Sequence, residues 1–156
     1  MKGQEMAEIT TGEFVEELWK TCKSSKAPLT QSELLRYGHF RGWLEDSDET
    51  HPQASLNRQT AARILHSFMV IECQIPDIAS ITPATELQDL YTCRVCANHI
   101  AQVYLRQIMN SQPLPAPKND SPRPLLFFNH LALLSQEEAL KAIHRVKEII
   151  SQKSAD

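Results

Sequence analysis

A chain of 156 residues is long enough to form one domain around its own hydrophobic core. Hydrophobic residues make up 42% of it and charged residues 22%, with only four glycines, and this composition favours a mainly helical globular fold. The net charge is −3 and the basic residues are scattered, which argues against the concentrated positive surface of a nucleic-acid-binding protein.

The sequence carries no recognisable targeting or membrane segment. Its first ten residues contain no apolar run of signal-peptide length, and no stretch reaches the roughly 18 apolar residues of a membrane span. We therefore expect a cytoplasmic protein, or a cell-surface protein if an upstream signal has been removed. The four cysteines, at positions 22, 73, 93 and 96, do not form a secreted disulfide framework, and we expect free thiols.

Two capping boxes predict the first two helices. Thr10-x-x-Glu13 precedes apolar residues at helical spacing, within an N-terminal segment of residues 1–29 that should pack on the main domain. Thr30-x-x-Glu33 begins a second helix that ends near Gly42, because glycine permits the left-handed backbone of a helix stop. Residues 44–54 then form an acidic loop.

The remaining elements follow from the same signals. Asn57 is the predicted N-cap of a third helix, which continues to Met69. Further along the chain we expect a short turn at Thr82-Pro83, a helix over residues 92–107, an extended proline-rich loop over residues 113–124, a last helix from Ser135 to about Ile150, and a tail of residues 151–156.

Two stretches share one pattern, Leu56-Asn-Arg-Gln-Thr-Ala-Ala-Arg-Ile-Leu65 and Leu134-Ser-Gln-Glu-Glu-Ala-Leu-Lys-Ala-Ile143. Each has an apolar residue before the cap, an alanine that we expect to be buried, and the same helical phase. Each also follows a helix and a loop. We therefore predict an all-α fold of two tandem helix-loop-helix pseudo-repeats, over about residues 30–73 and 84–150, that bury their apolar faces against each other.

These units resemble S-layer homology domains of bacterial proteins over roughly residues 30–150. Leu87-Gln-Asp-Leu90 is similar to the Phe-x-Asp-Val at the start of a family repeat, residues 99–109 to its first helix and exit turn, and Leu56 to Ala62 to its Ile-Thr-Arg-Ala-Glu-x-Ala motif. Family members usually carry three repeats on secreted proteins and bind cell-wall polysaccharide. This chain shows about two units, with Gln136 where the second motif arginine would stand.

The resemblance implies a glycan-binding role for one residue of this motif. The family's motif arginine contacts the anionic glycan near the groove between repeats, and this role would fall on Arg58. Trp43 would be its sugar-stacking neighbour. The alternative for Arg58 is an ordinary solvent-exposed position in the first turn of a helix.

Cys93-x-x-Cys96-x-x-His99 is a second candidate site. On a helix these side chains would cover one side, and Cys73 or His66 could complete a tetrahedral zinc site. A redox pair is another interpretation, although Cys-x-x-Cys oxidoreductases place the motif after a strand and the sequence predicts none there. The third interpretation is that small, half-buried cysteines pack at a helix interface.

No phosphate-binding glycine loop, Gly-x-Ser-x-Gly or His-Glu-x-x-His motif is present in the sequence. We therefore expect a binding module that is not an enzyme and needs no cofactor, with a protein or a cell-wall polysaccharide as its partner. The alternative is a small zinc- or thiol-dependent helical protein that uses Cys93, Cys96 and His99.

Overall fold

The computed structural model describes residues 8–22, 29–114 and 125–155, and this part of the chain is mainly helical, as predicted. Its α-helices are α2 (Thr11–Trp19), α3 (Gln31–Arg41), α4 (Asp46–Thr50), α5 (Arg58–Ile71), α6 (Ala97–Leu105) and α7 (Gln136–Ala155). Short 3-10 helices are η1 (Thr82–Glu86), η2 (Leu90–Thr92) and η3 (Arg94–Cys96). Strand β1 (Gln112–Leu114) pairs antiparallel with β2 (Leu125–Phe127), and most of the predicted proline-rich loop, residues 115–124, lies outside the described residues.

The predicted helix caps are confirmed. The Thr10 hydroxyl accepts a hydrogen bond from the Glu13 backbone N–H at 3.2 Å, and Thr30 caps α3 in the same way. The side-chain oxygen of Asn57 accepts from the Thr60 N–H at 2.8 Å. These bonds satisfy N–H groups that have no partner inside the helix. Gly42 ends α3 with φ +98°, the left-handed conformation that glycine adopts without strain.

Three predicted boundaries differ from the structure. The acidic loop over residues 44–54 contains the one-turn helix α4, and the helix expected over residues 92–107 is the shorter α6, preceded by 3-10 turns. Residues 151–155, expected to be a tail, continue α7. Helix ends depend on packing as well as on local propensity, which explains errors of this size.

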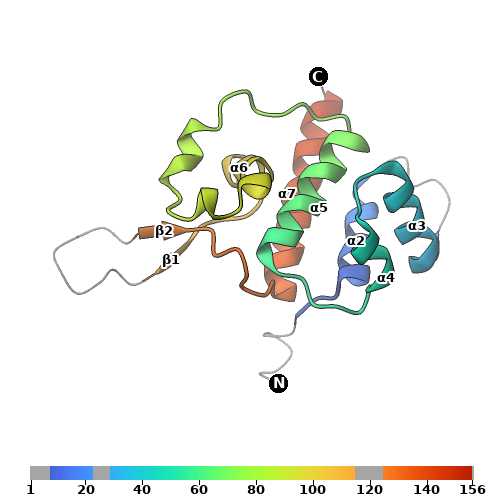
Figure 1. The fold of residues 1–156 in the computed structure, drawn as a ribbon. Helices are drawn as coiled ribbons and strands as arrows, with labels where there is room; N and C mark the ends of the chain where they lie inside the picture. Colours follow the sequence, from blue (N-terminus) through green and yellow to red (C-terminus); the bar gives the residue numbers. More distant parts are fainter. Residues whose placement is uncertain (1–7, 23–28, 115–124, 156) are drawn as a thin grey trace.

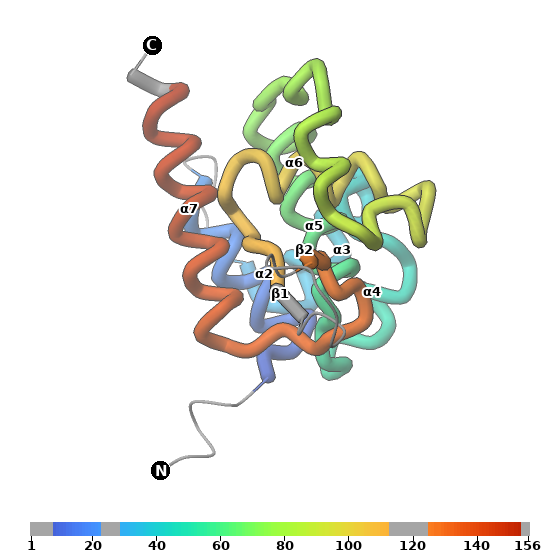
Figure 2. Tube along the Cα trace, turned by 90° about the vertical axis from the view of Figure 1, so that its left-hand side faces the viewer, coloured from blue at the N-terminus to red at the C-terminus, as the bar shows by residue number. Residues whose placement is uncertain are grey.

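The segments that precede α2, α5 and α7 pair with one another in a closed ring. The bridges are Glu8 with Ser135, Thr10 with Ser55, and Asn57 with Leu133. Each of the three segments therefore touches both of the others, and the N-terminal ends of three helices meet at one place. In Figure 1 these helices all run upward from the ring, and Figure 2 shows α7 along one edge of the molecule.

The first two N–H groups of α2 are satisfied by the loop before α5. The Thr11 N–H donates to the Ala54 carbonyl at 3.0 Å, and the Gly12 N–H donates to the Pro52 carbonyl at 2.9 Å. These carbonyls lie two and four residues before Leu56, the buried residue ahead of the α5 cap. The start of α2 is thereby fixed to the chain that enters α5.

The start of α5 repeats this pattern against the loop before α7. The Arg58 N–H donates to the Ala132 carbonyl at 2.9 Å, and the Gln59 N–H donates to the His130 carbonyl at 3.0 Å. These carbonyls lie two and four residues before Leu134, which is also buried. The same backbone geometry therefore joins α2 to α5 and α5 to α7.

Candidate functional site: the groove at the start of α5

A cavity of about 530 Å³ lies against the first turns of α5, and we call it the α5 groove. One wall comes from residues 45–56, the floor from residues 56–63, and the other wall from residues 93–99. Its volume falls within the roughly 300–1,000 Å³ of typical ligand pockets. The exposed side chain of Val95 lines it as well, so the groove offers both polar and apolar contacts.

Arg63 is the central charged residue of the groove. Its guanidinium donates two hydrogen bonds to the Asp48 carboxylate, at 2.8 and 3.0 Å, and its Nε lies 3.6 Å from a Glu45 carboxylate oxygen. Asp48 is buried and also accepts from the Glu45 backbone N–H at 2.7 Å. The bidentate pairing with Asp48 fixes the position of the guanidinium. The carboxylates of Asp48 and Glu45 together offset its charge, so the groove wall is polar without being strongly basic.

A hydrogen-bonded chain leads from Asp77 through His66 to His99 in the groove. Asp77 Oδ1 lies 2.6 Å from His66 Nε2, and His66 Nδ1 lies 2.8 Å from His99 Nδ1. Burial, helped by the neighbouring His66 and Arg63, lowers the pKa of His99 to about 4, so its ring is neutral at pH 7.

Two of the four cysteines, expected to be thiols, are joined in a disulfide. Cys93 and Cys96 form a disulfide with an S–S distance of 2.03 Å, and both line the groove. Cys22 and Cys73 are thiols that lie beside each other at the core, and burial together with Cys22 raises the pKa of Cys73 to about 12. Spacing alone could not distinguish a bonded Cys-x-x-Cys pair from a reduced one.

The suggested zinc ligands Cys93, Cys96 and His99 line the same groove. In this structure the two sulfur atoms are bonded to each other, so they are not available as thiolate ligands. Among the described residues, no group of three or more His, Cys, Asp or Glu side chains is arranged to hold a metal ion. A zinc site at this position would require the reduced pair, and it stays a prediction.

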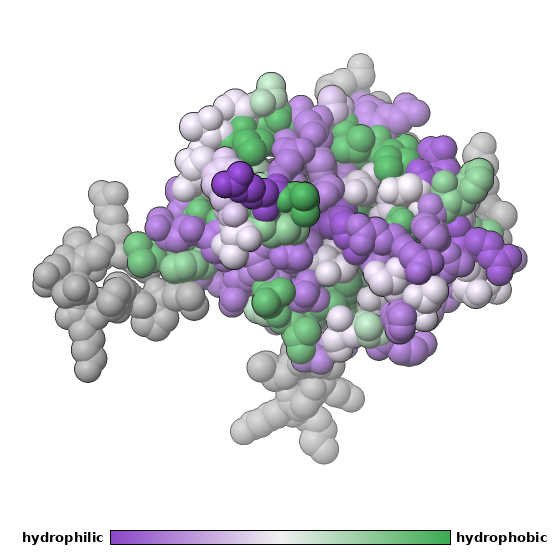
Figure 3. Space-filling view, viewed as in Figure 1, coloured by the Kyte–Doolittle hydropathy of each residue, from purple (hydrophilic) through white to green (hydrophobic). Residues whose placement is uncertain are grey.

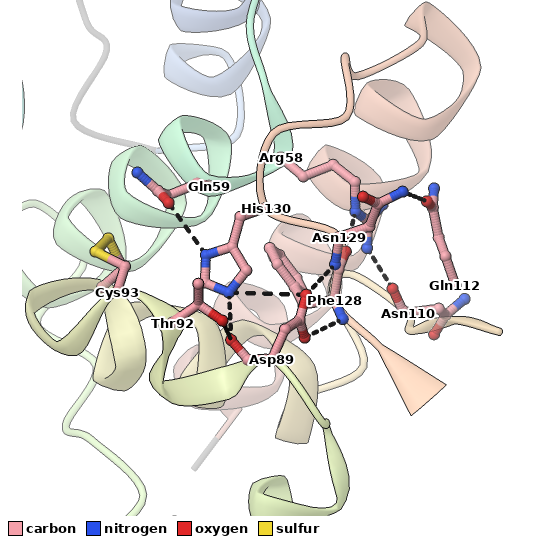
Figure 4. Close-up of polar contacts among 11 residues, drawn as sticks. Arg58, Gln59, Asp89, Thr92, Cys93, Asn110, Gln112, Phe128, Asn129 and His130 are labelled. Carbon is pink, nitrogen blue, oxygen red and sulfur yellow. Dashed lines mark hydrogen bonds and ion pairs between the residues drawn. A yellow bond between two sulfur atoms is a disulfide. The ribbon is translucent and has the colours of Figure 1, made fainter. Parts of the chain in front are cut away.

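Arg58 does not line the groove. Its side chain is fully buried, at 0% exposure, which contradicts both the glycan contact and the solvent-exposed alternative. Its Nε donates to the Phe128 carbonyl at 2.7 Å and its Nη2 donates to the Asn110 carbonyl, while Glu138 of α7 forms an ion pair with it. The guanidinium also lies 4.6 Å from the centre of the Phe128 ring. Arg58 therefore holds the second half of the chain against α5 (Figure 4).

Trp43 is also buried, at 1% exposure, and is not placed to stack on a sugar. Its ring packs edge-on against Phe68 at 5.0 Å, and its indole N–H donates to Glu72 at 3.1 Å. A groove is present close to these two positions in the sequence, but other residues line it. The nearest are Glu45, two positions after Trp43, and Gln59, directly after Arg58.

A polar network beside the groove was missed at the sequence level. Asp89 accepts hydrogen bonds from the Phe128 and Asn129 backbone N–H groups at 2.7 and 2.8 Å. His130 lies between the Asp89 carbonyl, at 2.7 Å, and the Gln59 side-chain oxygen, at 3.1 Å (Figure 4). The one available signal was Asp89 itself, the aspartate in Leu87-Gln-Asp-Leu90. Its carboxylate holds the turn that brings the chain back to α5.

The surface of the described residues and the comparisons with known proteins identify no further site and no family. On the face drawn in Figure 3, apolar side chains form small groups separated by polar ones. Among the described helices, none is long and apolar enough to cross a membrane. No protein-family model matches the chain, and no curated protein matches it either.

Proposed function

We propose that the chain is a non-catalytic binding module similar to an S-layer homology domain. We propose further that its α5 groove binds the uncharged, hydroxyl-rich sugars of cell-wall polysaccharide, and not the anionic groups that the family's motif arginine contacts. The observation that carries the proposal is the closed ring formed by the segments before α2, α5 and α7. Tandem repeats bury their apolar faces against one another, and the helix starts of α2 and α5, which make matching backbone contacts, support related units packed together.

The ring supports three repeat units where the sequence pattern indicated two. Ile9, Leu56 and Leu134 are each buried, each precedes a helix cap, and each belongs to one segment of the ring. The N-terminal helix α2, which we expected to be an accessory element, is then the last part of a first unit. The family usually has three repeats, so this arrangement is closer to it than two units would be.

The position of the groove supports binding between units. One wall belongs to the loop that joins α3 to α5, and the other belongs to the segment that begins α6. In the repeat interpretation these walls come from the second and third units. A pocket between repeats is the place where a ligand would contact both units at once.

The chemistry of the groove favours a neutral polar ligand. The Arg63 charge is offset by Asp48 and Glu45, and His99 is neutral at pH 7. Thr60 and Ser55 add hydroxyl groups that can donate or accept hydrogen bonds. An anion would find no unpaired positive charge among these residues, whereas sugar hydroxyls match the mixture of donors and acceptors.

Co-sedimentation with bacterial cell-wall sacculi tests the proposal. Ser47 is exposed and lines the groove, so Ser47→Trp fills the groove without disturbing the core. We expect it to weaken binding by about ten-fold or more. The matched control is Ser151→Trp at an exposed position near the end of α7, which should bind as the unchanged protein does. Arg58→Ala is a poor test because that side chain is buried.

Two results would reject the glycan proposal. One is an unchanged protein that stays in the supernatant at every sacculus concentration, which would direct the search to protein partners. The other is equal binding by the two tryptophan variants, which would place the glycan contact outside the groove.

A further inference from the structure

We propose that the Cys93–Cys96 disulfide is a thiol–disulfide exchange site that opens into the α5 groove and reacts with small thiol compounds. The proposal rests on the fold and the groove, and it does not depend on the polysaccharide as ligand. It concerns a reversible covalent reaction at two sulfur atoms, a chemistry that the binding function does not use.

The disulfide contributes little to holding the fold together. It joins residues only three positions apart, whereas the stabilisation from loop closure grows with the length of the loop, reaching about 3 kcal/mol for about 15 residues. The same segment is already held by backbone hydrogen bonds from the Thr92 N–H to Asp89 and from the Cys96 N–H to Cys93, both at 3.1 Å. A bond that connects no distant elements can therefore open without unfolding the domain.

The groove gives a small molecule access to the sulfur atoms. Both half-cystines line the cavity of about 530 Å³, and Cys93 is half-buried while Cys96 is only 9% exposed. Figure 4 shows the disulfide beside the polar network at the start of α5, where Gln59 also lines the groove. Attack is therefore expected at Cys93, the more exposed residue of the pair.

The surroundings of Cys96 favour its departure as a thiolate. Cys96 is the residue directly before α6, so its sulfur lies at the positive end of a nine-residue helix. This helix end stabilises negative charge, and a lower leaving-group pKa speeds thiol–disulfide exchange.

The reaction balances with two equivalents of a small thiol. The first thiolate attacks Cys93 Sγ, a mixed disulfide forms, and the electron pair of the broken S–S bond leaves with Cys96. A second thiolate attacks the small-molecule sulfur of the mixed disulfide and releases Cys93 as a thiolate. Two thiols are thus oxidised to one disulfide, and the protein pair becomes a dithiol that takes up the two protons.

Cys22 and Cys73 provide an internal control. Neither residue lines the groove, and Cys22 is buried. Burial raises the pKa of Cys73 to about 12, so little reactive thiolate forms on Cys73 at neutral pH. The same protein therefore contains one pair of sulfur atoms that should exchange and one pair that should not.

The test uses the full chain in native buffer containing glutathione at graded ratios of its reduced and oxidised forms. Samples are quenched with acid, alkylated and weighed as intact protein, and peptide mapping locates the alkyl groups. We expect Cys93 and Cys96 to become alkylated together as the buffer becomes more reducing, and to return to the disulfide in oxidised glutathione. Cys22 and Cys73 should be alkylated only after urea is added.

Variants identify the attacked sulfur and the route of access. In Cys96→Ser, oxidised glutathione should form one adduct, on Cys93, whereas in Cys93→Ser the adduct on Cys96 should form about ten-fold more slowly because that sulfur is less exposed. Ser47→Trp should slow exchange in the otherwise unchanged protein, and Ser151→Trp and Cys73→Ser should not.

The proposal is overturned if the unchanged protein exposes Cys93 and Cys96 to alkylation only in urea, or if its four cysteines react at similar rates. An unaltered rate in Ser47→Trp would overturn the groove as the route. The first measurement needs no variant and no wall material, so its outcome is separate from that of polysaccharide binding.

Discussion

Arg58 and Arg63 lie on the same helix and are used in opposite ways. Arg58 is fully buried and holds the backbone at Phe128 and Asn110 against α5. Arg63 stays at the edge of a cavity, paired with Asp48 in the loop before the helix. Arg58 fills the space between α5 and the second half of the chain, whereas Arg63 borders an open cavity. One arginine of α5 is therefore part of the architecture, while another on the same helix lines the cavity.

The largest expected effect is that of Arg58→Ala on folding. The change leaves Glu138 without its partner and the Phe128 and Asn110 carbonyls without a donor, and breaking a buried pair typically costs about 3–5 kcal/mol. We expect a loss of this size in the free energy of unfolding, measured by urea denaturation. A loss below about 1 kcal/mol would mean that water replaces these contacts. Arg58 would then contribute no more to stability than Arg63 does, which contradicts the comparison.

Asp89→Asn should have the next largest effect, on the closed side of α5. The amide keeps one acceptor oxygen, so either the Phe128 or the Asn129 N–H loses its partner. An unsatisfied buried donor costs about 1–3 kcal/mol, and urea denaturation should detect it. Glu137→Gln, an exposed change on α7, is the matched control and should leave the unfolding midpoint unaltered.

Arg63→Lys should destabilise the protein only slightly. Lysine keeps the positive charge beside Asp48 but cannot form the two parallel hydrogen bonds, and we expect a loss of about 1 kcal/mol. Binding to sacculi should weaken more clearly than folding does, because the groove wall changes shape. If the variant loses stability as strongly as Arg58→Ala, then Arg63 is also an architectural residue and the comparison fails.

A pH dependence of stability should come from His99. Its pKa is about 4 in the folded chain, against 6.5 without the fold, and the causes are burial, then His66 and Arg63, with Asp77 acting in the opposite direction. Between these values the unfolded chain binds a proton that the folded chain does not, so stability should fall as the pH drops from 6.5 toward 4. His99→Gln should flatten this dependence in urea denaturation series, and an unchanged slope would contradict the assignment.

Local signals in the sequence were sufficient for most of the fold. The caps at Thr10, Thr30 and Asn57 and the stop at Gly42 depend on residues close in sequence, and all four are present. The pairing of the segment before α2 with the segments before α5 and α7 was not predicted. Residues 9–18 have Phe14 where the other two stretches have alanine, so the pattern alone did not relate this segment to the other two.

The candidate site was predictable only in outline. A groove between units was expected near residues 43 and 58, and a cavity is present one or two residues away from each. The direction of the Arg58 side chain could not be predicted, because its acceptors at Asn110 and Phe128 lie more than fifty residues further along the chain. The Cys93–Cys96 bond likewise depends on redox state, which spacing does not specify.

Amide chemical-shift mapping with polysaccharide released from sacculi tests the central claim most directly, because it locates the contact without any substitution. The account predicts that shifts concentrate in residues 45–63 and 93–99, the two walls and the floor of the α5 groove, while the end of α7 stays unchanged. Shifts concentrated on another surface, or none at saturating polysaccharide, would contradict the claim that this groove is the binding site.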